Sequence, residues 1–162
     1  MLSGLGFYQE NSTSSGREGS VKEYFRIEDL EVYRKLCTLH IAVCELTKRW
    51  PTQERFELAS QIRRSSNSAP ANIAEKHSDR HVRNKIEGVN RARGEALETV
   101  HHLFVAHLKK YETAQTYASS RERYEQCVRM LNGLERSLER QLPPRERRFP
   151  SRSGSRDPDP DN

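Results

Sequence analysis

The sequence predicts an all-α protein, an antiparallel up-down-up-down four-helix bundle, and three observations support this. Between residues 27 and 142, apolar residues recur three or four positions apart, which is the spacing of one helix face. This stretch has no alternating apolar and polar run of strand length, and most glycines and prolines lie near the chain ends. Segments of about twenty residues with short connections make neighbouring helices antiparallel.

Composition divides the chain into three parts. Residues 1–24 are predicted to be a disordered arm, because their Ser, Thr, Gly and Asn residues bury too little surface to offset the entropy of ordering. Residues 25–142 carry the bundle, and with 33% apolar residues in the chain they can bury one modest core. Pro143 and Pro144 cannot continue a helix, so 143–162 is predicted to be a disordered tail rich in Arg, Pro and Asp.

The first predicted helix begins near Asp29, which suits an N-cap position, and ends at Trp50 and Pro51. Its expected buried stripe is Leu30, Tyr33, Cys37, Ile41 and Cys44. The second helix begins at Thr52, and its expected buried residues are Phe56, Ala59 and Ile62. Pro70 removes a backbone hydrogen bond from this helix, so either a kink or a break is expected there.

The third predicted helix begins between Ser78 and Asn84 and is the longest of the four. Its expected buried stripe is Ile86, Val89, Arg93, Leu97, Val100, Phe104 and Leu108. The fourth helix follows Ser119, which forms a capping-box pattern with Glu122, and ends at Leu142. Its expected buried stripe is Tyr124, Cys127 or Val128, Leu131, Leu134 and Leu138.

The sequence lacks the residue patterns that catalysis needs, so the protein is predicted to be no enzyme and to use no cofactor. It has no glycine-rich phosphate loop, nucleophile elbow or Cys-His signature. His77 and His81 have the i, i+4 spacing of two metal ligands, but no third ligand is evident, and a solvated pair is expected instead. Three cysteines within helical patterns predict reduced thiols and a cytoplasmic protein, and no apolar run approaches membrane-spanning length.

Charge offers a second indication of function. The formal net charge is +5, and residues 27–142 hold 20 basic and 16 acidic residues. Basic residues gather around the end of the second helix and the start of the third, and the candidates for nucleic-acid binding are Arg63, Arg64, Arg80, Arg83, Lys85 and Arg91. Such a cluster attracts a phosphate backbone, but Glu75, Asp79 and Glu87 lie among these residues, so a mixed solvated surface is the alternative.

Arg93 interrupts the apolar stripe of the third helix. Its guanidinium is expected either to be buried and paired, with Glu75 and Glu98 as the candidate carboxylates, or to reach solvent at a bundle end.

Three stretches resemble the four-helix-bundle family of proteins encoded by intervening sequences within bacterial 23S ribosomal RNA genes. They are FRIEDLEVYRKL (25–36), FELASQIRRSSNSAPANIAEKHSDR (56–80) and NRARGEALETV (90–100), and their order and spacing match over about 25–140. The resemblance implies a continuous second helix kinked at its proline, and a homo-oligomer, typically a pentamer, with a proposed nucleic-acid role. Related bundles are accessory variability determinants of diversity-generating retroelements, where they bind a reverse transcriptase and RNA.

By position, the recurrent polar residues of that family correspond to Arg63, Arg64, Asn72, Glu75, Asn90, Arg93, Gly94 and Glu98. Two positions depart from the family pattern: Lys76 replaces a glycine, and Glu95 replaces a small residue.

Two functions are compatible with these features. The first is a non-catalytic pentameric scaffold that binds RNA or other nucleic acid through its basic surface. The second is a protein-only adaptor, such as an accessory subunit of a retroelement reverse transcriptase. Salt dependence distinguishes them, because binding to phosphates weakens steeply as salt rises and apolar interfaces do not.

Overall fold

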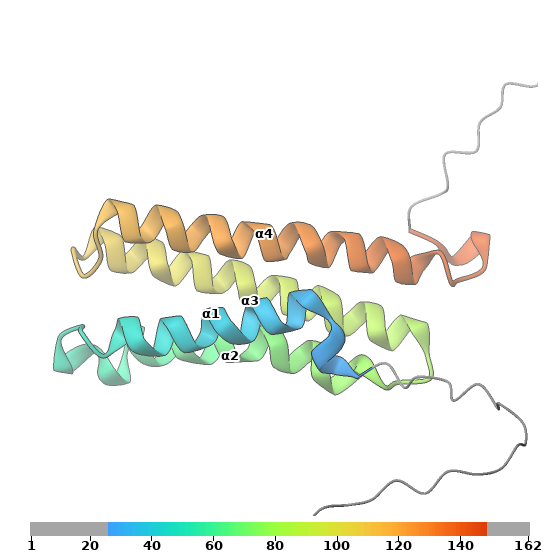
Figure 1. The fold of residues 1–162 in the computed structure, drawn as a ribbon, viewed down its shortest axis with the longest axis horizontal. Coiled ribbons are helices and arrows are strands. Elements are labelled where there is room, and N and C mark those ends of the chain that lie inside the picture. The colour runs from blue at the N-terminus through green and yellow to red at the C-terminus, as the bar shows by residue number, and fades with distance from the viewer. Residues whose placement is uncertain (1–25, 149–162) are drawn as a thin grey trace, which may run out of the picture.

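The computed structural model describes residues 26–148, and within this range the chain forms helices and no strand (Figure 1). The α-helices are α1 (Glu31–Thr47), α2 (Leu58–His77), α3 (Val82–Leu108) and α4 (Ala114–Glu139). The short 3-10 helices are η1 (Ile27–Asp29), η2 (Thr52–Phe56) and η3 (Pro144–Glu146). The all-α prediction is confirmed. The predicted arm at 1–24 and the tail beyond residue 148 lie outside the described residues.

Consecutive helices run antiparallel, as their cross-contacts show. Between α1 and α2, His40 contacts Ser66 whereas Thr47 contacts Arg63, so residue numbers rise on one helix and fall on the other. Contacts join α2 to α3 in the same sense, at Arg64–Glu98 and Asn72–Gly88. Arg93 pairs with Glu135 of α4, and Arg83, earlier on α3, pairs with Glu146 of η3, beyond the end of α4. This order is consistent with the predicted up-down-up-down topology.

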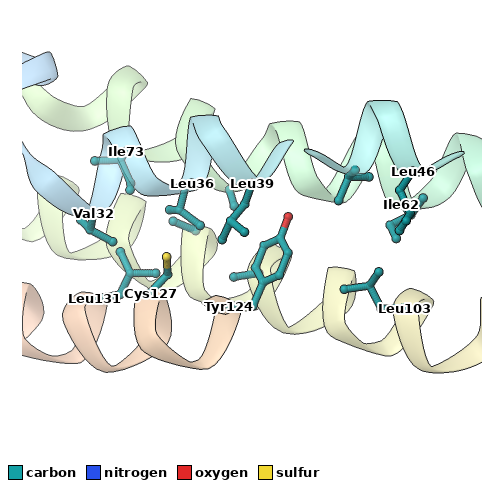
Figure 2. Packing of buried hydrophobic residues seen from close by; sticks show 14 of the residues in the cluster. Val32, Leu36, Leu39, Leu46, Ile62, Ile73, Leu103, Tyr124, Cys127 and Leu131 are labelled. Carbon is teal, nitrogen blue, oxygen red and sulfur yellow. The ribbon is translucent and has the colours of Figure 1, made fainter. Parts of the chain in front are cut away.

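One apolar core runs along the bundle, and α1 contributes a stripe of buried valine and leucine residues to it (Figure 2). The buried apolar residues of α1 are Val32, Leu36, Leu39, Val43 and Leu46. The predicted stripe was therefore displaced by about one position: Tyr33, Cys37 and Cys44 are half-buried, and Ile41 is 62% exposed. Both stripes have helical spacing, and the packing of α1 against α2 decides between them.

The start of α1 also differs from the prediction. Asp29 belongs to η1, where its carboxylate accepts a hydrogen bond from the backbone N–H of Arg26. Leu30 occupies the N-cap position of α1, without a side-chain cap.

The prediction for α3 was wrong in its large apolar residues. Exposed fractions are 50% for Leu97, 43% for Phe104 and 62% for Leu108. The residues that α3 buries are mostly small, namely Gly88, Val89, Ala92, Ala96, Thr99, Leu103 and Ala106. Small side chains let α3 approach α2 and α4 closely, and the larger apolar residues remain on its outer face.

α2 and α3 approach each other closely at Gly88. A Cβ atom at this position would lie 2.8 Å from the carbonyl oxygen of Asn72 and 2.8 Å from Cβ of Lys76. The tight contact thus exists although Lys76 stands where the resemblance implied a glycine, because the small residue is on the opposite helix. α2 is continuous through the buried Pro70, which excludes the break considered from the sequence.

The start of α4 was predicted too late. The helix begins at Ala114, and Thr113 caps it by accepting a hydrogen bond from the N–H of Thr116 at 3.1 Å. Ser119 lies inside the helix. At the start of α2, the exposed Phe56 belongs to η2 and does not enter the core.

At one end of the bundle, the buried carboxylate of Glu54 connects η2 to the loop that follows α3. Glu54 is 2% exposed and accepts hydrogen bonds from Nζ of Lys109 at 2.5 Å and from the hydroxyl of Tyr111 at 2.8 Å. These two hydrogen bonds lower the pKa of Glu54 below its ordinary value, against the opposing effect of burial. Beside them, Nε1 of Trp50 donates to Glu112 at 2.6 Å. This end of the bundle is therefore closed by polar contacts.

Candidate nucleic-acid interface

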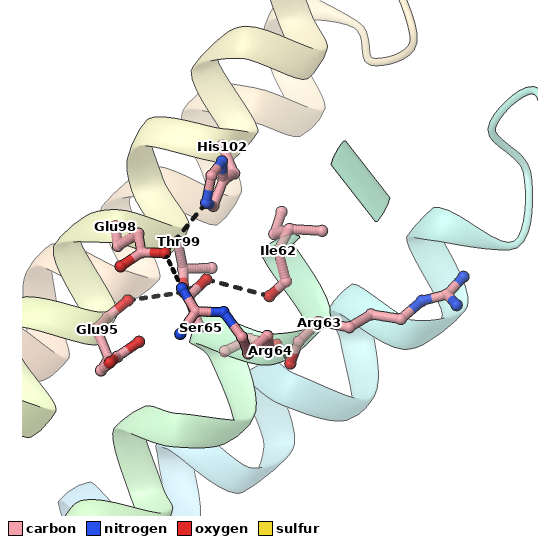
Figure 3. A network of polar contacts seen from close by, with 9 residues as sticks. Ile62, Arg63, Arg64, Ser65, Glu95, Glu98, Thr99 and His102 are labelled. Carbon is pink, nitrogen blue, oxygen red and sulfur yellow. Dashed lines mark hydrogen bonds and ion pairs between the residues drawn. The ribbon is translucent and has the colours of Figure 1, made fainter. Parts of the chain in front are cut away.

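The six predicted nucleic-acid-binding residues do not form one surface. Arg63 and Arg64 lie in the first half of α2, where Nε of Arg63 donates to the hydroxyl of Thr47 at 2.7 Å. Arg64 forms an ion pair with Glu98 at 2.7 Å, and His102 approaches the same carboxylate at 3.4 Å (Figure 3). Nearby, the hydroxyls of Ser65 and Thr99 are 2.9 Å apart in the interior. The two arginines thus participate in packing between helices.

A second group of basic residues meets at the opposite end of α2. Arg80, Arg83 and Lys85 occupy the α2–α3 turn and the first turns of α3. The guanidinium of Arg83 pairs with Glu146 at 2.7 Å, which holds η3 beside the start of α3 (Figure 1). We call the set Arg80, Arg83, Lys85, Arg145 and Arg148 the basic end.

Sequence reasoning missed Arg145 and Arg148, both of which are exposed. It assigned them to the tail, whose first residues are basic, but the Arg83–Glu146 contact that brings them to α3 spans 63 residues. Arg147 has a structural role instead, because it donates to the carbonyl oxygens of Arg140 and Leu142 near the end of α4. A cation at this position also interacts favourably with the negative, C-terminal end of the α4 dipole.

The α2–α3 turn is ordered by Asp79. Its carboxylate accepts hydrogen bonds from the N–H of His81 at 2.8 Å and from the side chain of Asn84 at 2.9 Å. These hydrogen bonds lower the pKa of Asp79 below its ordinary value. The turn leaves Arg80 exposed, and within residues 26–148 neither Arg80 nor Lys85 forms an ion pair.

Arg91 lies farther along α3 and is paired locally. Its guanidinium is 2.6 Å from Glu87, one turn earlier, and both side chains are exposed. An exposed i, i+4 pair contributes at most about 0.5 kcal/mol. Arg91 therefore adds little unbalanced charge to the basic end.

Arg93 is the centre of a polar cluster between α3 and α4. Its guanidinium donates to Glu135 at 2.5 Å, to Asn132 at 2.8 Å and to the side-chain oxygen of Asn90. The side chain of Glu135 is 4% exposed. Arg93 is thus paired, as the first alternative expected, but its side chain is 24% exposed, so the buried member of the pair is Glu135.

The candidate partners named for Arg93 from the sequence were wrong. Glu98 pairs with Arg64, and the exposed Glu75 lies 3.1 Å from Lys76.

The other two residues of the family's polar pattern have different surroundings. The side-chain amide of Asn72 donates to the carbonyl of Ser68 at 2.8 Å, within α2. Gly94 is exposed, and a Cβ atom there would have no neighbour within 4 Å. Packing within the described part of the chain therefore does not require a glycine at position 94.

His77 ends α2, whereas His81 precedes α3, so the pair does not share one helix face. Across residues 26–148, no group of three or more His, Cys, Asp or Glu side chains is placed to hold a metal ion. None of the helices in that range has the length and apolar character needed to cross a membrane.

These observations define a class: a small four-helix bundle with a basic end, an internal Arg–Glu cluster and apolar residues exposed on α3. The model of the 23S rRNA-intervening sequence protein family matches residues 28–133, and the chain belongs to this family. A similar solved structure is a protein of unknown function from the S23 ribosomal protein family of Bacteroides thetaiotaomicron VPI-5482. It has a TM-score of 0.58 and 24% identity, over 64% of this chain and 97% of that one, and the likeness is one of fold. Among curated proteins, none matches the sequence.

Proposed function

We propose that this protein is a non-catalytic, self-assembling cytoplasmic scaffold that binds RNA or other nucleic acid at its basic end. The observation that carries the proposal is the Arg83–Glu146 ion pair, which brings basic residues from two distant segments together. Arg80, Lys85 and Arg148 have no ion pair within the described range, so their charges are available to phosphates. Binding of phosphates there would release counterions, which is favourable at low salt.

Replacing Arg80 and Lys85 together by glutamate tests the basic end. We expect binding to a structured ribosomal RNA fragment to weaken about 10-fold or more at low salt. The slope of log K against log salt should become shallower by about 0.7–0.9 for each phosphate that the variant no longer neutralises. Fluorescence anisotropy titrations at several salt concentrations measure both quantities.

A matched control places the same charge change at the other end of the bundle, through Arg55→Glu with Lys110→Glu. This control should retain wild-type affinity and slope, because neither residue lies at the basic end. If both double variants bind RNA as the wild type does, the basic end is a solvated surface. The protein-only adaptor is then the better function.

The outer face of α3 supports self-assembly. Leu97, Phe104 and Leu108, which we call the α3 ridge, are exposed at i, i+7 and i+11 and so lie on one side of the helix. Contiguous exposed apolar residues mark association surfaces more often than isolated ones do. The expected product is a closed cyclic homo-oligomer, with five subunits as the number that the family resemblance implies.

Glutamates at Leu97 and Phe104 are expected to dissociate this oligomer. Light scattering should then give a mass near that of one chain, 18.8 kDa, compared with about five times that mass for the wild type. Ile41→Glu is the matched control, because Ile41 is an exposed apolar residue on α1 rather than α3. A single-chain mass for the wild type at micromolar concentration would rule out the oligomer.

A further inference from the structure

The bundle is open along the seam between α1 and α4. These two helices pack against each other less extensively than α2 packs against α3 or α3 against α4. Two hollows, of about 430 Å³ and 310 Å³, lie along this seam, and Leu39 and Arg123 line both of them. We call the continuous depression the α1–α4 groove. On α1 it extends from Glu31 to Arg49, which corresponds to about 27 Å of helix.

The floor of the groove is apolar and the α4 border is polar. The floor consists of Leu39, Val43, Leu46, Tyr124 and Cys127, which are buried residues of the core. The α4 border adds uncharged polar side chains, namely Gln115, Thr116, Ser119, Ser120 and Gln126. These floor residues are at most 8% exposed, so a ligand seated here would touch only the outer edges of their side chains and would find hydrogen-bonding groups along one side.

The charged residues of the border are mostly basic. They are Arg34, Lys35, Arg49 and Arg123, against one acidic residue, Glu31. Lys35 lies 3.4 Å from Glu31, and Arg34 donates to a backbone carbonyl. Arg49 and Arg123 form no ion pair with any residue between 26 and 148.

The unpaired state of Arg123 contrasts with that of its neighbours on α4. Arg121 pairs with Glu125 at 2.6 Å, and Arg129 pairs with Glu122 at 2.8 Å. Among these three arginines, the one without a carboxylate is the one that borders the groove. A carboxylate from a binding partner would give Arg123 the kind of ion pair that Arg121 and Arg129 form within the chain. Arginine binds carboxylates in a directional, bidentate geometry.

We propose that the α1–α4 groove docks an amphipathic helix from a different protein, with an apolar face bordered by aspartate or glutamate. A groove that lies along two helices and has an apolar floor suits a further helix, which inserts residues at i, i+3, i+4 and i+7. The length of the groove fits about 18 helical residues. Acidic borders complement Arg49 and Arg123, and this docking site is separate from the basic end and from the α3 ridge.

Two labelled peptides of about 18 residues test the proposal on the full-length protein. Both carry leucine on one helical face, one has glutamate on both borders of that face, and the other has lysine there. Fluorescence anisotropy should show that the glutamate peptide binds at least about 10-fold more tightly than the lysine peptide. Equal binding of the two peptides, or binding of neither, would overturn the proposal.

Variants locate the binding site on the protein. Arg49→Glu with Arg123→Glu should weaken the glutamate peptide about 10-fold or more and strengthen the lysine peptide. The control Arg55→Glu with Arg136→Glu has the same charge change away from the groove and should bind as the wild type does. Ala42→Trp, which introduces bulk at an exposed groove position, should abolish binding of both peptides.

The results separate this inference from the proposed RNA function. The Arg80→Glu, Lys85→Glu variant should bind the glutamate peptide normally, and the Arg49→Glu, Arg123→Glu variant should bind RNA normally. If the second variant instead loses RNA and binds the peptide as before, the groove is a nucleic-acid surface and the docking proposal is wrong. If the wild type binds neither peptide and the glutamate peptide binds only after the α3 ridge is mutated, a second copy of the chain covers the groove and the docking proposal is wrong.

Discussion

Replacing Arg93 by methionine is expected to lower the free energy of unfolding by about 3 kcal/mol, because it leaves the buried carboxylate of Glu135 without its partner charge. The buried Glu135 accepts from Arg93 through Oε2, while its Oε1 has no hydrogen-bond partner in the described part of the chain. Without the guanidinium, this carboxylate would remain buried without a compensating charge. Urea denaturation followed by circular dichroism measures the change.

A second variant distinguishes the loss of the ion pair from the loss of packing. In Arg93→Met with Glu135→Leu, both charges are removed, and the double variant is expected to be more stable than Arg93→Met alone. If the double variant is less stable than the single one, the cluster is held by the volume of its side chains rather than by charge compensation.

Replacing Leu131 by alanine is expected to cost about 2–5 kcal/mol, because the change leaves a cavity in a packed interior. Leu131 has no exposed surface and lies beside Val32 and Cys127 in the core (Figure 2). The matched control on α1, Ile41→Ala, removes a side chain that is 62% exposed and should cost less than about 1 kcal/mol. Urea denaturation of both variants gives the comparison, and similar losses of stability would mean that the buried face of α1 has been misidentified.

Helical spacing was sufficient to predict the fold class and the four helices, but not which side of each helix is buried. On α1, the stripe through Tyr33 and the stripe through Val32 both recur every three or four residues. On α3, the large side chains at Leu97 and Phe104 drew the prediction to the outer face, since the buried face is made mostly of small residues such as alanine and glycine. Hydrophobicity alone favours large residues, whereas close helix packing selects small ones.

Only the part of the candidate site that is formed by residues close together in the sequence could be predicted. Basic residues around the α2–α3 turn are adjacent in the sequence, so Arg80, Arg83 and Lys85 could be grouped from it. The carboxylate that binds Arg93 lies 42 residues away, at Glu135, and cannot be identified from spacing. Arg145 lies at the basic end because its neighbour Glu146 pairs with Arg83, which is 63 residues away in the sequence and could not be identified from spacing either.

The contact at Gly88 limits which substitutions this sequence can tolerate during evolution. A side chain at position 88 would meet the carbonyl oxygen of Asn72, which belongs to the α2 backbone and cannot move without displacing the helix. Its other neighbour is Lys76, whose Cβ and Cγ atoms would lie 2.8 Å and 2.9 Å from a Cβ at position 88, and a smaller residue at position 76 makes no new contact while Gly88 is kept. Substitutions at this crossing are therefore tolerated at position 76 on α2 but not at position 88 on α3. Related chains without a glycine at position 88 would need a larger distance between the two helices.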